Sequence, residues 1–185
     1  GIGLAIATSL KAAGHRVVIT YRSGTPPTGF DAVQMDVTDS ASVDAGFAKI
    51  EAEIGQPEII VANAGITKDT LVMRMSDEEW FDVINTNLSS IYRLSKGVLR
   101  GMMKARTGRI VNITSVVGHA GNAGQANYCA AKAGVSGMTR SLADPLGGYD
   151  PDLAWRLAPF VLPLLAVQWV QYLSGRLDFL SFRWL

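Results

Sequence analysis

The chain has 185 residues, enough for one domain with a real core, and its 48% hydrophobic and 18% charged residues are typical of a globular protein. A net charge of +1 gives no electrostatic basis for nucleic-acid binding. The one cysteine, Cys129, excludes an intrachain disulfide and is compatible with a reducing compartment, so we expect a cytoplasmic protein. We predict no metal site. No signal peptide is visible and the chain begins with Gly rather than Met, so we expect a fragment or a processed product.

The first motif is Gly1-Ile2-Gly3, which opens directly into a predicted helix that ends near Gly14. A buried strand is predicted next, over residues 15–20. A helix and then a strand, led by Gly-x-Gly, form the back half of a βαβ dinucleotide-binding unit. The two glycines of the motif would allow backbone N–H groups to approach a pyrophosphate at the helix N-terminus.

Arg22 lies just past this strand, and no acidic residue stands at the strand end. An acidic residue there binds the ribose 2′-OH of NAD, whereas an arginine accommodates the 2′-phosphate of NADP. The alternative is an ordinary solvated arginine in a loop. A second strand is predicted over 32–37, ending in Asp36 and Val37 and followed by a capped helix over about 41–54. The plain interpretation of Asp36 is a turn residue that caps local backbone.

A third strand is predicted over residues 58–62, and it runs directly into Asn63-Ala64-Gly65. Ligands bind at the carboxyl ends of strands in open α/β sheets. Gly65 has no side chain, so it would let the backbone pass close to a cofactor. The pattern therefore predicts part of a ligand site after this strand.

A long helix begins with a capping box of Ser76 and Glu79 and is predicted to run to about Met103. Asn85 and Asn87 interrupt it. Asparagine is unfavourable inside a helix, so two of them invite a structural or functional reason. The alternative for Asn87 is a tolerated asparagine on the surface.

The last strand is predicted over 110–115 and ends at Ser115. Residues 118–124 are rich in glycine and are predicted to form a flexible loop near the site. We interpret His119 as a residue of this loop rather than a catalytic base.

Tyr128 and Lys132 lie on a helix predicted over about 127–143. Four residues apart, they share one face of the helix. An ammonium near a phenol favours the phenolate, so we predict that the pKa of Tyr128 is lowered and that it acts as a general acid or base. The alternative is an amphipathic helix on which the lysine snorkels to solvent.

Four polar residues, in this order and with the glycine motif ahead of the first helix, carry a resemblance. They are Asn87, Ser115, Tyr128 and Lys132. Over residues 1–143 the chain resembles the short-chain dehydrogenase/reductases, and most of all the 3-oxoacyl-[acyl-carrier-protein] reductases. The resemblance implies an α/β fold with a doubly wound, Rossmann-like parallel sheet and the cofactor NADP(H).

The resemblance also implies a role for each of the four residues. Tyr128 would protonate the developing alkoxide, while Lys132 would lower the pKa of Tyr128 and hold the nicotinamide ribose. Ser115 would hydrogen-bond the substrate carbonyl and polarise it. The backbone carbonyl of Asn87 would hold a water in the proton relay.

Cofactor-binding residues follow from the same resemblance. Gly1 and Gly3 match the last two glycines of the family pattern Thr-Gly-x-x-x-Gly-x-Gly, whose first strand and first glycine are absent here. By the same resemblance, Asp36 and Val37 at the end of the second predicted strand would contact the adenine. Residues 63–65 would form the wall beneath the ribose and nicotinamide, where Asn63 would also stabilise the sheet. The full predicted set is Gly1, Ile2, Gly3, Arg22, Asp36, Val37, Asn63, Ala64, Gly65, Tyr128 and Lys132.

Partners are implied as well. Arg106 matches a position that docks the acidic carrier protein in related reductases; the alternative is a solvated basic turn. The helix over 127–143, with small residues along one face, and the long helix before it serve dimerisation in the family. We therefore expect a homodimer or homotetramer of the full-length parent.

The resemblance stops at residue 144. The tail over 144–185 lacks the expected family motifs and carries a mostly apolar stretch over 157–173 that contains Pro159 and Pro163. A membrane segment is the alternative, but its seventeen residues are about the shortest span and two prolines break it. We expect a frameshifted or wrongly joined reading frame. The predicted domains are thus a partial dinucleotide-binding domain, 1–143, and a non-matching tail.

The predicted function is NADPH-dependent reduction of a carrier-protein-bound 3-oxoacyl thioester to the 3-hydroxyacyl form in fatty-acid biosynthesis. The alternatives are reduction of another ketone or oxidation of an alcohol, and an inactive fragment of such an enzyme. Without the family's first strand, the strands at 16–20 and 58–62 would face a gap. We therefore expect the chain by itself to be poorly stable and inactive.

Overall fold

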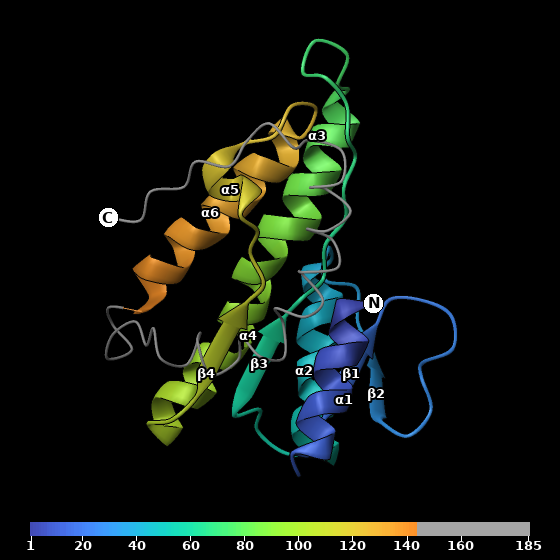
Figure 1. Ribbon diagram of the computed structural model, residues 1–185. Helices are drawn as coiled ribbons and strands as arrows, with labels where there is room; N and C mark the ends of the chain where they lie inside the picture. Colours follow the sequence, from blue (N-terminus) through green and yellow to red (C-terminus); the bar gives the residue numbers. More distant parts are fainter. Residues whose placement is uncertain (144–185) are drawn as a thin grey trace. The chain divides into compact units, whose positions relative to one another are not determined.

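A computed structural model describes residues 1–143 of the chain, which fall into two compact units, 1–16 and 17 onward (Figure 1). The first unit contains helix α1, Ile2–Ala12, with Gly1 at its N-cap. The helix ends at Gly14, whose φ of 92° suits a residue without a side chain, and the His15 N–H donates to the Leu10 carbonyl at 3.1 Å. The predicted helix and its stop are confirmed.

The second unit combines parallel strand pairs with helices, as the α/β class requires, so the predicted fold class is confirmed. Its strands are β1 Val18–Tyr21, β2 Asp31–Gln34, β3 Ile59–Ala62 and β4 Arg109–Asn112. Its helices are α2 Ser40–Glu53, α3 Asp77–Ile84, α4 Ser90–Ala105, α5 Val117–Ala120 and α6 Ala126–Ala143, with a π-helical turn, η1 Asn85–Ser89, joining α3 to α4.

The strands of the second unit form two parallel pairs. Strand β1 pairs with β2, from Val18 opposite Asp31 onward, and β3 pairs with β4, from Ile59 opposite Arg109 onward. Within the described residues the two pairs are separate sheets, so β1 and β3 do not hydrogen-bond to each other. This separation agrees with the gap predicted between these two strands, and it leaves Ile59 49% exposed.

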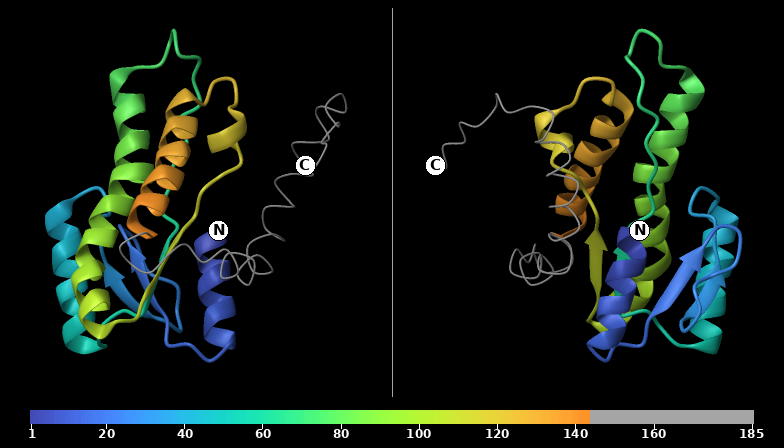
Figure 2. Two further views of the ribbon diagram at one scale, coloured as in Figure 1. Left: turned by 90° about the vertical axis from the view of Figure 1, so that its left-hand side faces the viewer. Right: turned by 45° about the vertical axis from the view of Figure 1, so that its right-hand side comes forward.

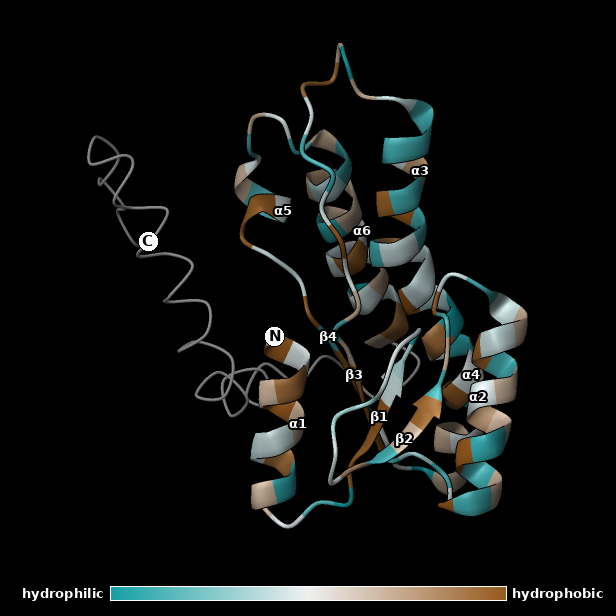
Figure 3. Ribbon diagram, turned by 90° about the vertical axis from the view of Figure 1, so that its right-hand side faces the viewer, coloured by the Kyte–Doolittle hydropathy of each residue, from teal (hydrophilic) through white to brown (hydrophobic). Residues whose placement is uncertain are grey.

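Helices α2 and α4 pack on the strands and on each other to make the core. Gly97 of α4 allows the close contact, because a Cβ there would lie 2.5 Å from Cδ2 of Phe47. Figure 3 shows hydrophobic and hydrophilic residues sharing α2, as an amphipathic helix requires. The buried core consists of Val33, Met35, Val43, Phe47, Ile50, Ala62, Ile91, Leu94, Val98, Met102 and Val135.

Local side-chain contacts fix where the helices begin. The Asp39 carboxylate accepts from the backbone N–H groups of Ala41 and Ser42 and so caps α2. Ser76 and Glu79 form the predicted capping box at the start of α3. The predicted long helix is confirmed, with η1 placed where its two asparagines stand.

Two predictions near the site are wrong in detail. The last strand ends at Asn112, so Ser115 lies beyond it, and the expected flexible loop contains helix α5. Gly118 explains the order of this segment: its N–H donates to the Ser115 carbonyl at 3.0 Å, and a Cβ on it would lie 2.9 Å from the backbone nitrogen of Ala133. The glycine therefore lets α5 lie directly against α6.

No helix among residues 1–143 is both long and apolar enough to cross a membrane. The tail, with its predicted frameshift and alternative membrane segment, lies outside the described residues, and the division into a domain and a tail stays a prediction.

Candidate active site

Helix α6 carries Tyr128 and Lys132 one turn apart, and both face the segment that follows β4. The Ser115 side chain hydrogen-bonds the Tyr128 phenol. Lys132 Nζ donates to the Ile113 carbonyl at 2.7 Å, and Thr114 Oγ1 donates to the Lys132 carbonyl at 3.1 Å. Three of the four predicted catalytic residues are thus brought together by two segments of the chain.

Lys132 is buried, with only 4% of its surface exposed. Burial lowers its pKa, because an ammonium loses its hydration there. The Nζ atom lies over the Tyr128 ring, 5.6 Å from its centroid. The alternative of a lysine that snorkels to solvent is therefore wrong for this helix.

The pKa of Tyr128 is raised, so the predicted lowering is wrong in this structure. Burial of the half-buried phenol is the largest cause, the hydrogen bond with Ser115 acts in the opposite sense, and the charges of Asp69 and Cys129 raise the pKa further. Lys132 does not offset these effects, because its ammonium is directed to the Ile113 carbonyl rather than to the phenol oxygen. Tyr128 is consequently neutral at ordinary pH, which is the form that donates a proton.

Asn87 lies in η1 and is fully buried. Its Nδ2 donates to the Ile66 carbonyl at 2.8 Å, and the Ile66 N–H donates to its Oδ1 at 2.7 Å. The neighbouring Asn85 accepts from Arg93 Nη2 at 2.7 Å. These hydrogen bonds explain why two asparagines stand inside the long helix, and the alternative of a surface residue is wrong for Asn87. The water-holding role of its backbone carbonyl stays a prediction.

Asn63, Ala64 and Gly65 follow β3, and the bonds between Asn87 and Ile66 fix the chain just beyond them. A Cβ at Gly65 would lie 3.2 Å from Asn87 Oδ1, so the absence of a side chain permits this close approach. The predicted wall segment is thus held rigidly beside η1. Its contact with a cofactor stays a prediction.

Arg22, Asp36 and Val37 lie at the carboxyl ends of β1 and β2, which are adjacent parallel strands. The Asp36 carboxylate accepts from Thr38, both from its N–H at 2.9 Å and from its Oγ1 at 2.7 Å. These two bonds, the side-chain one first, lower the Asp36 pKa, and the nearby Arg22 charge adds to the effect. The interpretation of Asp36 as a turn residue that caps local backbone is therefore confirmed. Arg22 is exposed and lies near it.

Gly1, Ile2 and Gly3 stand at the N-terminus of helix α1, in the first unit, and their role in binding a cofactor stays a prediction. Arg106 is exposed and ends α4 in the left-handed conformation, with φ at 53°. The docking role of Arg106 stays a prediction.

The sequence analysis did not identify Asn127 as a residue of the site. It is fully buried beside Tyr128, and its side chain bonds to three backbone groups. The only sequence signal was an asparagine next to the tyrosine of the motif. Both views in Figure 2 show α6 (orange) beside the helix formed by α3 and α4 (green), the arrangement that Asn127 bridges.

Among residues 1–143, no three His, Cys, Asp or Glu side chains gather as metal ligands would. The ionisable groups that α6 brings to the site are the phenol of Tyr128 and the ammonium of Lys132, and the Ser115 side chain hydrogen-bonds the phenol.

Comparison with known proteins agrees with this arrangement. A family model described as short chain dehydrogenase matches residues 1–150, slightly beyond the predicted end of the resemblance at 143. The 3-oxoacyl-[acyl-carrier-protein] reductase FabG of Pseudomonas aeruginosa is 52% identical over 158 residues, which cover 80% of this chain and 64% of the relative. Those of Escherichia coli (strain K12) and Haemophilus influenzae are 53% and 50% identical over 154 residues, covering 77% of this chain and 62% of each relative.

The chain thus spans a little under two thirds of the length of the curated relatives it matches. Identity of about half over such a stretch, with a family model over most of the chain, leads to one conclusion. The chain belongs to the short chain dehydrogenase family.

Proposed function

We propose that the whole protein reduces a 3-oxoacyl thioester carried by acyl carrier protein to the 3-hydroxyacyl form, with NADPH as the reductant. The observation that best supports this proposal is the arrangement around the Tyr128 phenol: it is neutral, it is hydrogen-bonded by Ser115, and the buried Lys132 ammonium lies over its ring. The printed names of the relatives support the choice of substrate, since each is called a 3-oxoacyl-[acyl-carrier-protein] reductase.

Each side chain has a distinct task in this proposal. Tyr128 gives its proton to the substrate oxygen as negative charge develops there. Ser115 hydrogen-bonds the same oxygen and polarises the carbonyl. Lys132 holds the nicotinamide ribose; burial lowers the pKa of its ammonium, whose Nζ lies 5.6 Å from the centroid of the Tyr128 ring.

The residues present fit a nicotinamide cofactor with a 2′-phosphate. Exposed Arg22 supplies a cation at the carboxyl end of β1, and the Asp36 carboxylate beside it is already satisfied by Thr38. Gly65 leaves the backbone after β3 bare of a side chain. When bound, NADPH would supply a hydride to the substrate carbonyl. Arg22, residues 63–65 and Lys132 are the groups of the second unit that we propose to hold it. The role of Gly1, Ile2 and Gly3 in binding the cofactor stays a prediction.

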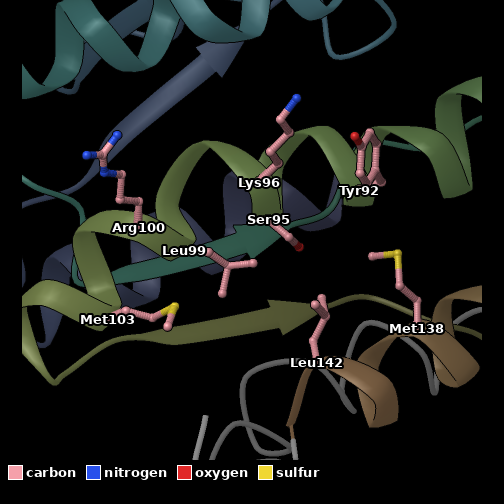
Figure 4. Close-up of a pocket in the computed structure, with 8 residues that line it drawn as sticks. All are labelled: Tyr92, Ser95, Lys96, Leu99, Arg100, Met103, Met138 and Leu142. Atoms are coloured by element: carbon pink, nitrogen blue, oxygen red, sulfur yellow. The ribbon is translucent and has the colours of Figure 1, made fainter. Parts of the chain in front are cut away.

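We also propose that α4 and α6 form the contact between two copies of the chain. A groove of about 510 Å³ runs between these helices (Figure 4), and the Oγ atom of buried Ser95 has no hydrogen-bond partner there among the described residues. Tyr92 and Met103, 56% and 61% exposed, leave apolar surface to be covered. The groove is lined by Tyr92, Ser95, Lys96, Leu99, Arg100, Met103, Met138 and Leu142.

A second candidate is that residues 1–185 alone neither bind NADPH nor react. The observation that favours it is that, within residues 1–143, the β1–β2 and β3–β4 pairs form two separate sheets, because an interrupted sheet leaves backbone groups at its strand edges unpaired. Under this candidate Ser115, Tyr128 and Lys132 lie close together, but no binding site for the cofactor forms between the two pairs of strands.

The experiment is a titration of purified residues 1–185 with NADPH, followed by an assay of NADPH oxidation with an acetoacetyl thioester of acyl carrier protein. The proposed function predicts saturable binding and turnover that Tyr128→Phe removes. Tyr92→Phe, the same change on an exposed tyrosine of α4, should leave turnover intact. Turnover that survives in Tyr128→Phe would contradict the proposed reaction, and an unaltered chain without turnover would favour the second candidate.

A further inference from the structure

Asn127 is the second residue of α6 and its side chain is completely buried. Its Nδ2 group donates to the Lys68 carbonyl at 3.1 Å and to the Glu79 carbonyl at 3.2 Å. Its Oδ1 accepts from the Tyr128 N–H at 2.7 Å. Both donor hydrogens and one acceptor site of the amide are therefore used, all by backbone groups.

These three backbone groups belong to three different segments of the second unit. Lys68 lies in the segment between β3 and α3, Glu79 lies in the first turn of α3, and Tyr128 lies in α6. The partner of Asn127 that is most distant in sequence, Lys68, lies 59 positions away. The Asn127 amide thus connects the start of α6 to the segment before α3 and to the first turn of α3.

The segment after β3 is itself fixed from the other end. Asn87 holds Ile66 by two hydrogen bonds, and the Thr70 N–H donates to the Gly124 carbonyl at 2.8 Å. Asn127 therefore anchors Tyr128 to a support that is rigid by its own contacts, rather than to a loose loop.

Lys132 does not depend on this anchor. Its Nζ bonds to the Ile113 carbonyl, and its own carbonyl accepts from Thr114 Oγ1. The two reactive side chains of α6 are thus held by separate contacts, with Asn127 at the tyrosine and the segment after β4 at the lysine.

We propose that Asn127 is a positioning residue that sets the Tyr128 phenol against Ser115, an inference that rests on the proposed role of Tyr128 as proton donor. Removing the amide would free the first turn of α6, where the tyrosine stands, and leave the turn of Lys132 in place. The Ser115 hydroxyl and the Tyr128 phenol would then no longer be held at hydrogen-bonding distance, although the helix persists.

The test measures how strongly Ser115 affects Tyr128, with and without Asn127. 3-Fluorotyrosine is placed at position 128 of residues 1–185, and its ionisation is followed by fluorine NMR, which reports one site and needs neither cofactor nor substrate. The fluorine makes the phenol more acidic and brings its titration to milder pH. Asp69, Cys129 and Lys132, the other ionisable groups near the phenol, stay unchanged in every variant.

With Asn127 present, Ser115→Ala should raise the phenol pKa, because the hydrogen bond from Ser115 favours the phenolate. With Asn127→Ala, the same Ser115→Ala change should shift the pKa by less than about half as much, since a double-mutant cycle isolates the contact between the two groups. Asn127→Ser is a milder truncation whose hydroxyl cannot reach the Lys68 and Glu79 carbonyls, so it should reduce the effect of Ser115→Ala on the phenol pKa by the same amount. It provides the test if Asn127→Ala does not fold.

Val135→Ala is the matched control, because it truncates a buried side chain of the same helix without touching these hydrogen bonds. It should leave the effect of Ser115 on the phenol at full size. The proposal is overturned if the Ser115 effect survives in the Asn127 variants, or if Val135→Ala abolishes it equally, which would assign Asn127 a general stabilising role. The measurement needs no turnover, so it remains readable even if the assay of thioester reduction fails and the proposed function is abandoned.

Discussion

Asn87 and Ile66, 21 residues apart in the chain, exchange two hydrogen bonds. The asparagine amide donates to the Ile66 carbonyl at 2.8 Å and accepts from the Ile66 N–H at 2.7 Å, as a paired strand residue would. The residue sits in the π-helical turn between α3 and α4, a feature often found at functional sites. One buried side chain therefore replaces a missing backbone partner for the segment that leaves β3.

Replacing this amide should destabilise the chain. We expect Asn87→Ala to lower the free energy of unfolding by about 1–3 kcal/mol, because it leaves the backbone groups of Ile66 without their partners. Asn85→Ala is the control in the same turn: it removes one bond from Arg93, which keeps its bonds to Val37 and Ser40. Urea unfolding measures both. An Asn87→Ala protein no less stable than Asn85→Ala would contradict the role assigned to the pair.

The proton donor is tested by Tyr128→Phe. We expect the variant to lose at least about a hundredfold in reduction rate, the typical contribution of a general acid, and to bind NADPH nearly unchanged because the ring remains. The assay uses a chimera in which the Escherichia coli relative supplies the part of its length that this chain does not match. Turnover above about a tenth of the unaltered chimera would exclude proton transfer by the phenol.

Cofactor preference is tested at Arg22. Changing Arg22→Asp should reverse a preference for NADPH over NADH, because the carboxylate repels the 2′-phosphate and accepts a hydrogen bond from a ribose hydroxyl. Binding constants for both cofactors in the same chimera give the ratio. Arg16→Asp, which makes the same charge change before β1, is the control for a nonspecific effect of charge. An unchanged ratio in Arg22→Asp would show that this arginine does not read the phosphate.

The buried ammonium of Lys132 predicts a pH dependence of stability. Its folded pKa lies below the ordinary 10.5, so between these two values the unfolded chain holds a proton that the folded chain has released. Stability therefore rises with pH across that window. We expect the free energy of unfolding of the unaltered chain, relative to Lys132→Met, to increase as the pH rises from neutral toward 10.5. The contribution of Tyr128 is common to both proteins, and a flat or falling difference would contradict the burial of a charged lysine.

Two glycines near the site provide a matched pair of substitutions. Gly118→Ala should cost about 1–3 kcal/mol, because the new Cβ would lie 2.9 Å from backbone atoms of α6. Gly137→Ala meets nothing within 4 Å among residues 1–143 and should stabilise α6 by about 0.5–1 kcal/mol, since alanine loses less backbone entropy in a helix. Thermal unfolding of the two variants measures the contrast. Equal effects would mean that α5 does not lie directly against α6.

Helices were more predictable from the sequence than strands. The capping box of Ser76 and Glu79 and the cap at Asp39 fix helix starts through contacts within three residues, so local sequence was enough. The strands were predicted over 15–20, 32–37 and 110–115 and are shorter or displaced, at 18–21, 31–34 and 109–112. A strand ends where its partner ends, and the partner is distant in sequence.

The sequence by itself determined the order of Asn87, Ser115, Tyr128 and Lys132 and the helical spacing that places the last two on one face, because both depend only on neighbours along the chain. The tertiary structure decided the rest of the site. Whether the Tyr128 pKa rises or falls depends on how far the phenol is buried and where the Lys132 ammonium is directed. The anchoring by Asn127 depends on carbonyls 48 and 59 residues away. Burial and hydrogen bonds of this reach exist only once the chain has folded.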